Sequence, residues 1–508
     1  MAKQPSERLY RLIHALTSSE KRYFKLHLQR EAAQNRKYIE LFDALNRQAS
    51  FDDEVIQRRL YGKVVKGKKY SELKAYLYDH LLVVLRTFDE RSSVEHQLKA
   101  QLLGISSLFR RSLFDDCRVL VEKTRKPARR FEHLHTLLQL LDWEKKLAYT
   151  RTDIPWLDRE LARIDRRERE LLTQLDDINT LQNLFFQLLI GIRKSALRSP
   201  EIRAQLTELE AHRLLQAPDA TGTFRGERLY YRIRGILAYA ANDYAEFYRL
   251  NRTLIALLES RPAWLREDLE DYLAALNNFI IACGHLRRYD EIEACLTKYD
   301  DLQEVSRDDS YKIFRQQYAT RFRLLISQGK FDEGRAALEH HFADPNSERI
   351  ERSGFYFQYF YLYFGSGDYP QALHWLNEWL NLPRSIERQD LQSLARVLNL
   401  VVHYEMDNLF LLDSLVRSTA RFLDRKEVAT EFERTVTNFF RRLLRLPPGT
   451  ERRKAFATLR TALQRLRASA GEKAMLELFD IESWALAHEQ RRAFSEVVRD
   501  AYRARLTE

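Results

Sequence analysis

The apolar residues of this chain recur at intervals of three and four positions along almost all of its 508 residues. This spacing is the period of an α-helix, whereas a half-buried β-strand alternates apolar and polar residues, and no sustained alternation occurs. The 15 glycines and 11 prolines make up about 5% of the chain, compared with roughly 12% in average proteins. Because turn-dense β-proteins need more of both residues, we predict an all-α protein.

The length of the chain argues against one continuous core, because single cores stop growing at about 250–300 residues. Three cysteines, Cys117, Cys283 and Cys295, are too few for a disulfide scaffold and fit a reducing compartment. The first residues contain no apolar run typical of a secretory signal. The longest strongly apolar run, residues 184–192, is too short to cross a bilayer. We therefore expect a cytoplasmic protein that has no membrane contact.

The net charge of +11 is concentrated at the two ends of the chain. Residues 1–92 carry 19 basic and 12 acidic side chains, and residues 434–508 carry 16 and 9, so the centre is slightly acidic. The densest stretches are residues 58–74, with seven basic residues, and residues 441–467, with nine. Such clusters attract phosphate backbones, acidic proteins or anionic lipids, although a solvated helix face has the same composition.

Residues 1–92 have the pattern of a separate basic helical domain. Three positions in this segment have the side chains and spacing of helix N-caps. They are Thr17 with Glu20, Asp52 or Asp53, and Ser71. A lysine-rich link, residues 62–69, joins the third predicted helix to a long fourth helix that begins after Ser71.

From about residue 93 the pattern becomes one of helix pairs, and one set of spacings recurs. Tyr356, Phe360, Tyr363, Gly367, Tyr369 and Ala372 stand at offsets 0, +4, +7, +11, +13 and +16. The same frame fits five further segments less completely. These segments begin at Gln101, Tyr231, Leu276, Tyr318 and Arg396.

The stretch Gly367 to Ala372 resembles the turn and second-helix start of a tetratricopeptide repeat (TPR). The resemblance implies that offset +11 makes the turn, that +13 fills the space between helices and that a small residue at +16 allows close approach. The clearest aromatics at +13 are 38 to 45 residues apart, compared with roughly 34 in the standard repeat. The chain is therefore similar to divergent, long-helix members of that class.

This resemblance implies a TPR-like α-solenoid of antiparallel helix pairs. We expect the solenoid at residues 93–448, after the N-terminal helical domain at 1–92 and before a basic C-terminal helical cap at 449–508. Because helix pairs bury their apolar faces by stacking, this arrangement explains the length of the chain. The alternative is an irregular helical array without true repeat geometry.

Motifs for catalysis are absent or incomplete. The segment from Gly62 reads G-x-x-x-x-G-K, but Lys69 stands where a phosphate-binding loop needs Ser or Thr, and the residues before it read as a helix. The pairs His133/His135 and His340/His341 lack the spacing of a metal site, and the cysteines read as core residues. We therefore predict no enzymatic activity, no cofactor and no metal, unless an active site is assembled only in three dimensions.

The TPR resemblance also suggests which positions face the concave surface of the stack. From these positions we select six candidates for a peptide groove: Arg232, Tyr239, Asn277, Arg323, Phe357 and Tyr361. Arginine, amide and aromatic side chains suit peptide recognition. The predicted function is a non-catalytic scaffold that binds a protein or peptide partner in this groove. Simple core packing is the alternative interpretation of the aromatic run at residues 355–364.

The second functional hypothesis is a nucleic-acid-binding regulatory protein that uses the basic N-terminal helices. The candidate anion patch consists of Arg58, Arg59, Lys63, Lys66, Lys68 and Lys69. Helices at residues 52–60 and 71–88 would form a helix-turn-helix variant. Their link of about ten residues is longer than the usual turn of three to four residues.

Overall fold

The structure is a computed structural model. It describes residues 7–30, 32–65, 68–90, 93–151, 153–193, 209–302, 307–344, 355–382, 389–424, 430–468, 472, 475–476 and 478–507. These residues form 24 α-helices and one 3₁₀ turn, and they contain no β-strand. The prediction of an all-α fold is confirmed.

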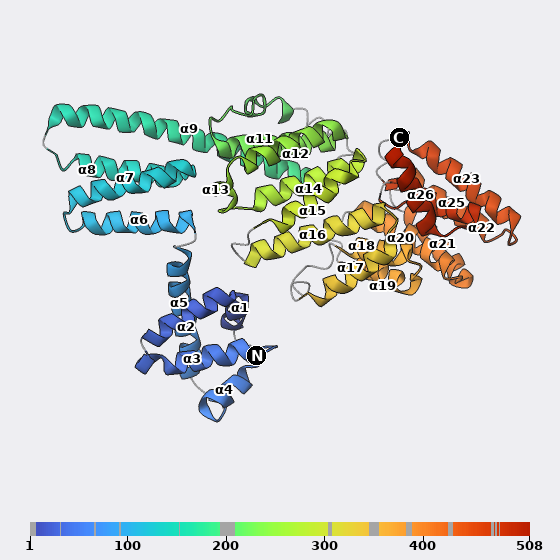
Figure 1. The fold of residues 1–508 in the computed structure, drawn as a ribbon, viewed down its shortest axis with the longest axis horizontal. Coiled ribbons are helices and arrows are strands. Elements are labelled where there is room, and N and C mark those ends of the chain that lie inside the picture. The colour runs from blue at the N-terminus through green and yellow to red at the C-terminus, as the bar shows by residue number, and fades with distance from the viewer. Residues whose placement is uncertain are drawn as a thin grey trace.

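The first five helices form a unit with its own core. They are α1 (Arg8–Ala15), α2 (Ser18–Arg30), α3 (Ala32–Arg47), α4 (Asp53–Tyr61) and α5 (Lys68–Asp89). Their buried apolar side chains, from Leu9 to Val84, form one cluster that contains no residue from later helices. Figure 1 shows this unit set apart from the long row of helices and joined to it at the end of α5.

Two of the three predicted helix caps in this unit are present. The backbone N–H of Thr17 donates to the Glu20 carboxylate at 2.6 Å, and the N–H of Glu20 donates to Thr17 Oγ1 at 3.3 Å. Asp52 accepts hydrogen bonds from the two backbone N–H groups at the start of α4. These contacts satisfy N–H groups that have no partner within the helix.

The predicted cap at Ser71 is wrong, because α5 begins three residues earlier, at Lys68. The side chain of Tyr70 is buried, and its hydroxyl donates to Asp53 Oδ1 at 3.0 Å. Lys74 Nζ forms an ion pair with the same carboxylate oxygen at 2.8 Å. These contacts with Asp53 hold the first turns of α5 against α4, so the link between the two helices is shorter than predicted.

The later helices pack as consecutive neighbours, in a row that Figure 1 shows from α6 to α26. The pairs are α6 (Val94–Phe109) with α7 (Phe114–Arg130), α8 (Leu134–Ala148) with α9 (Ile154–Arg193), α11 (Phe224–Ala240) with α12 (Tyr244–Glu259), α14 (Glu270–His285) with α15 (Tyr289–Asp300), α16 (Arg307–Ser327) with α17 (Phe331–Ala343), α18 (Tyr356–Gly365) with α19 (Tyr369–Leu380), α20 (Gln389–Glu405) with α21 (Leu409–Asp424), α22 (Glu431–Leu443) with α23 (Thr450–Leu466), and α25 (Ile481–Gln490) with α26 (Phe494–Thr507). Two short elements, η2 (Arg213–Leu215) and α13 (Pro262–Leu265), lie between pairs.

All six segments of the sequence frame make the same turn. The residue at offset +11 has a left-handed backbone in each, with φ between 54° and 80°. These residues are Ser112, Asn242, Arg287, Gly329, Gly367 and Asp407. The next N–H donates to the carbonyl five residues earlier, as in Lys330 to Leu325 at 2.9 Å, which is a Schellman turn. The second helix then begins at offset +13 in every segment.

Successive pairs share a regular pattern of contacts. The second helix of one pair packs on the first helix of the next, as α12 does on α14 and α17 on α18. First helices also contact one another, as α14 does α16 and α16 does α18. The apolar face of each pair is therefore covered by its neighbours, as in stacked helical repeats.

Residues 157–175 are highly charged and have one apolar stripe, which predicts a long exposed helix stabilised by its own charge pairs. Helix α9 contains this stretch but differs from that prediction. It is 40 residues long and packs on α8 and α11, with Ile164 and Leu181 fully buried. Some of its charges do pair within the helix, as Arg169 does with Asp165 at 3.0 Å. Others reach α8, as Glu168 does to Lys145 at 2.6 Å. Ile164 and Leu181 are covered because α9 bridges two neighbouring helix pairs.

The last two helices return along the stack. The ring of Phe494 lies 5.7 Å from the ring of Phe331 and 5.5 Å from that of Phe364. At the turn before α17, a Cβ built on Gly329 would lie 2.8 Å from the backbone nitrogen of Arg499 in α26. The C-terminal helices therefore cover the turn edge of earlier pairs.

Candidate anion-binding site

Two of the predicted groove residues, Asn277 and Arg323, contact each other. Each lies on the first helix of a different helix pair. Arg323 of α16 donates to Asn277 Oδ1 of α14 at 3.4 Å. Tyr239 of α11 is near enough to interact electrostatically with Arg323, although burial dominates and lowers the pKa of that guanidinium. Arg323 has no ion pair with any residue that the structure describes. This part of the predicted groove is thus a half-buried polar cluster.

Two other predicted groove residues are held in contacts within the protein. Arg232 forms an ion pair with Asp271, and its guanidinium lies 4.2 Å from the centre of the Phe185 ring. Phe357 is half-buried, and its ring packs on that of Trp379 at 5.1 Å. Both side chains therefore stabilise contacts between helices.

The prediction that Tyr361 lines an open groove is wrong. Its side chain is buried, and its hydroxyl accepts a hydrogen bond from the backbone N–H of Asp480 at 2.9 Å. Its ring also packs on that of Phe479 at 4.8 Å. The C-terminal segment covers this position, so Tyr361 belongs to the core.

The predicted N-terminal anion patch is spread over three elements. Arg58 and Arg59 lie at the end of α4, Lys63 lies in the link, and Lys68 and Lys69 lie in the first turn of α5. All five are exposed, and Lys66 lies outside the described residues.

Two features weaken a helix-turn-helix reading of α4 and α5. Arg58 is paired with Glu54 at 2.9 Å. The exposed positions of α5 include Glu72 and Asp79, which would repel a phosphate backbone. The patch therefore has less free positive charge than its composition suggests.

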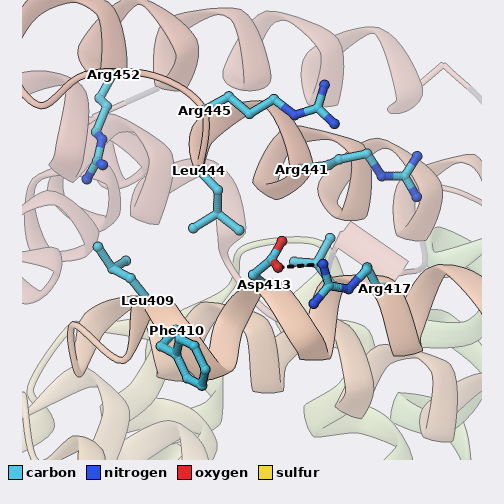
Figure 2. Close-up of a pocket in the computed structure, with 9 residues that line it drawn as sticks. Leu409, Phe410, Asp413, Arg417, Arg441, Leu444, Arg445 and Arg452 are labelled. Carbon is cyan, nitrogen blue, oxygen red and sulfur yellow. Dashed lines mark ion pairs between the residues drawn. The ribbon is translucent and has the colours of Figure 1, made fainter.

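A different set of basic residues converges on a pocket between α21, α22 and α23 (Figure 2). The pocket has a volume of about 450 Å³. It is lined by Leu409, Phe410, Asp413, Val416, Arg417, Arg441, Leu444, Arg445 and Arg452. Four arginines against one aspartate leave the lining with a net charge of three positive.

Local structure explains how these arginines come together. Helix α22 begins at a capping box between Thr430 and Glu433 and buries its apolar face, so Arg441 lies on the opposite, exposed side. The chain then turns at residues 447–449, where Gly449 adopts φ 107° and ψ −131°. This conformation is essentially restricted to glycine. It starts α23 so that Arg452, in the first turn, reaches the same pocket.

The pocket has positive charge that the described residues do not neutralise. Arg417 pairs with Asp413 at 2.7 Å. Arg441 donates to Asn438 Oδ1 at 3.2 Å, and Arg452 donates to the Leu446 carbonyl at 3.2 Å. Among the residues that the structure describes, no acidic side chain pairs with Arg441, Arg445 or Arg452. An anion would complete this arrangement.

An apolar edge adjoins the arginines. Phe410, at the start of α21, is 98% exposed, and the neighbouring Leu411 is 47% exposed. In the view of Figure 2, Phe410 lies on the opposite side of the pocket from Arg441 and Arg445. The site therefore combines an anion-binding wall with an accessible aromatic ring.

The sequence patterns did not predict this site, although two of them include residues that line it. The dense basic stretch at residues 441–467 contains Arg441, Arg445 and Arg452, and the last repeat frame reaches Leu409 at the start of α21. Their convergence with Arg417 depends on how three helices pack, which neither pattern contains.

The described residues contain no group of three or more His, Cys, Asp or Glu side chains placed to hold a metal ion. All three cysteines are buried. Burial raises the pKa of the Cys283 thiol to about 12 and that of Cys295 to about 11, which disfavours a reactive thiolate.

Comparisons with protein-family models, with curated proteins and with solved structures gave no match for this chain. Among the helices that the structure describes, none is both long enough and apolar enough to span a bilayer.

Proposed function

We propose that this protein is a non-catalytic interaction scaffold that binds an acidic segment of a partner protein at the pocket between α21 and α23. The observation that carries the proposal is the group of three arginines around one pocket, Arg441, Arg445 and Arg452, which have no acidic partner among the described residues. Charge-assisted hydrogen bonds from arginine to carboxylates are among the strongest polar contacts in proteins.

We further propose that the helix pairs form a TPR-like solenoid. The support is the left-handed turn that recurs in all six segments of the frame, together with the contacts between successive first helices. In such a stack, the cluster of Tyr239, Asn277 and Arg323 would lie on the inner helices, as a polar surface separate from the pocket. The buried free cysteines fit a cytoplasmic setting.

The proposal is tested by measuring how two labelled peptides bind to the full-length protein. One 12-residue peptide is rich in Asp and Glu, and the second replaces each acidic residue with its amide. We expect the acidic peptide to bind more tightly and to weaken as salt rises. Replacing Arg441 and Arg445 by alanine should weaken its binding by at least about tenfold, because each lost charged hydrogen bond costs roughly 1.5–3 kcal/mol.

Arg442→Ala is the matched control. Arg442 is also exposed and stands one residue from Arg441 on α22, but it does not line the pocket. Its replacement should leave binding almost unchanged. Equal losses in R442A and in the double variant, or no loss in the double variant, would reject the pocket as the binding site.

A further inference from the structure

We propose that this pocket takes a phosphorylated side chain, a phosphoserine or phosphothreonine in a partner peptide whose neighbouring apolar residue packs on Phe410. This inference rests on the proposed function and names the chemistry of the ligand. It is drawn from the charge of the lining, from the placement of the arginines and from the exposed ring.

The charge of the pocket fits a dianion better than a single carboxylate. Its lining has four arginines and one aspartate, and that aspartate already pairs with Arg417. One carboxylate would offset one of the three remaining positive charges. A phosphate monoester carries about 1.5 to 2 negative charges at neutral pH and offers three acceptor oxygens. Several guanidinium groups can bind these oxygens at once.

The arrangement of the arginines suggests where each part of the peptide lies. In Figure 2, Arg417, Arg441 and Arg445 are on one side of Leu444, and Arg452 is on the other. We assign the phosphate to the side with three arginines and a flanking acidic residue of the peptide to Arg452. Leu444 lies between these two points, and the buried Val416 adds a second apolar side chain to the lining.

The surroundings favour a phosphopeptide over a nucleic acid. A strand of nucleic acid needs unpaired basic side chains along its path. Beyond the pocket, two basic residues of α23 are paired: Lys454 with Glu451 at 3.1 Å and Arg460 with Glu489 at 2.9 Å. These two pairs interrupt the positive charge along α23, whereas three arginines that have no acidic partner among the described residues line one pocket.

The experiment compares three peptide pools on the full-length protein. The pools share randomised flanks that contain one acidic and one aromatic or aliphatic residue, and they differ only in the central residue: phosphoserine, glutamate or serine. We expect the phosphoserine pool to be retained at least about tenfold more than the serine pool, and more than the glutamate pool. R441A/R445A should abolish the preference for phosphoserine.

Two single variants complete the design. F410S should weaken retention of all pools that carry the apolar residue, because Phe410 is almost fully exposed and its replacement disturbs no core. R442A should retain the wild-type preference. Circular dichroism spectra of each variant check that the fold is intact.

The outcomes separate this inference from the function on which it rests. If glutamate and phosphoserine pools are retained equally and both depend on Arg441 and Arg445, the phosphate assignment is overturned and the acidic-segment scaffold stands. If no pool is retained, both proposals are rejected. If a single-stranded oligonucleotide binds more tightly than the phosphoserine pool and depends on the same arginines, the ligand is a nucleic acid, and the phosphopeptide proposal is overturned.

Discussion

At the scale of single residues, the turn inside a helix pair requires a left-handed backbone, and two such turns use glycine in different surroundings. Gly329 and Gly367 have φ values of 67° and 80°. A Cβ on Gly367 would meet no atom within 4 Å, whereas one on Gly329 would lie 2.8 Å from the backbone nitrogen of Arg499 and 3.0 Å from the Ser495 carbonyl oxygen. A side chain at Gly367 would therefore cause backbone strain alone, whereas one at Gly329 would cause backbone strain and a clash with α26.

Alanine at each glycine gives a matched pair of variants. G367A should lower the free energy of unfolding by about 1–2 kcal/mol, the usual cost of a left-handed non-glycine residue. G329A should lose about 1–3 kcal/mol more, because the new methyl group displaces α26. Urea unfolding followed by circular dichroism measures both values. Equal losses would mean that α26 does not rest on the turn at Gly329.

The position of these turns could be read from the sequence because their chemistry is local. Glycine, asparagine and aspartate tolerate a left-handed backbone, and they occupy offset +11 in four of the six segments. Ser112 and Arg287 adopt the same geometry without that preference. The apolar spacing of the frame located them, since the aromatic or apolar residue two positions later starts the next helix.

At the scale of elements, the spacing of apolar residues predicts the helix α9 but does not predict which of its residues are buried. A charged helix with one apolar stripe has the same sequence whether the stripe is covered by one neighbour or by two. In the structure, Leu181 is fully buried with Leu214 and Leu237, whereas Leu172 on the same helix is 49% exposed. The length of α9 and its contact with α11 determine this difference, and both lie beyond the reach of a local pattern.

These two leucines test the packing of α9. L181A should lower the free energy of unfolding by about 2–5 kcal/mol, because it leaves a cavity in a covered core. L172A removes the same atoms from a partly solvated position, so its cost should be below about 1 kcal/mol. Chemical denaturation of the two variants gives the comparison. Similar small losses would favour a detached, charge-stabilised helix after all.

At the scale of the whole molecule, the return of α25 and α26 explains what the sequence could not predict. Tyr361 contacts Asp480, which is 119 residues away in the chain. The repeat frame treats each pair alike and contains no information about a later segment that covers one of them. The same limit hid the arginine pocket, because Arg417 and Arg452 meet only through the packing of α21 against the following pair.

One carboxylate links three elements of this C-terminal assembly. Glu405 of α20 accepts hydrogen bonds from Trp484 Nε1 at 2.5 Å and from His488 Nε2 at 2.6 Å, both on α25. Tyr369 of α19 donates to it as well. Burial by itself would raise the pKa of Glu405, but these hydrogen bonds and the electrostatic attraction of His488 outweigh burial and hold the pKa below its ordinary value.

The direction of this shift predicts how stability depends on pH. Because the folded pKa of Glu405 is lower than the unfolded value of about 4.3, its stabilising contribution is complete above that value and is lost as pH falls through the folded pKa. The variant E405Q should lose about 1–3 kcal/mol at neutral pH. Its free energy of unfolding should then fall less steeply than that of the wild type as pH drops below about 4.3.

Glu451→Gln is the matched control for this experiment, because Glu451 forms an exposed pair with Lys454 and such pairs contribute about 0–1 kcal/mol. Urea titrations at several pH values between neutral and acid would measure the three curves. Wild type and E405Q with parallel curves below about pH 4.3 would show that Glu405 does not hold α25 to α19 and α20. A shallower curve for E405Q alone would place the acid sensitivity of the molecule at the junction where its last helices return to the stack.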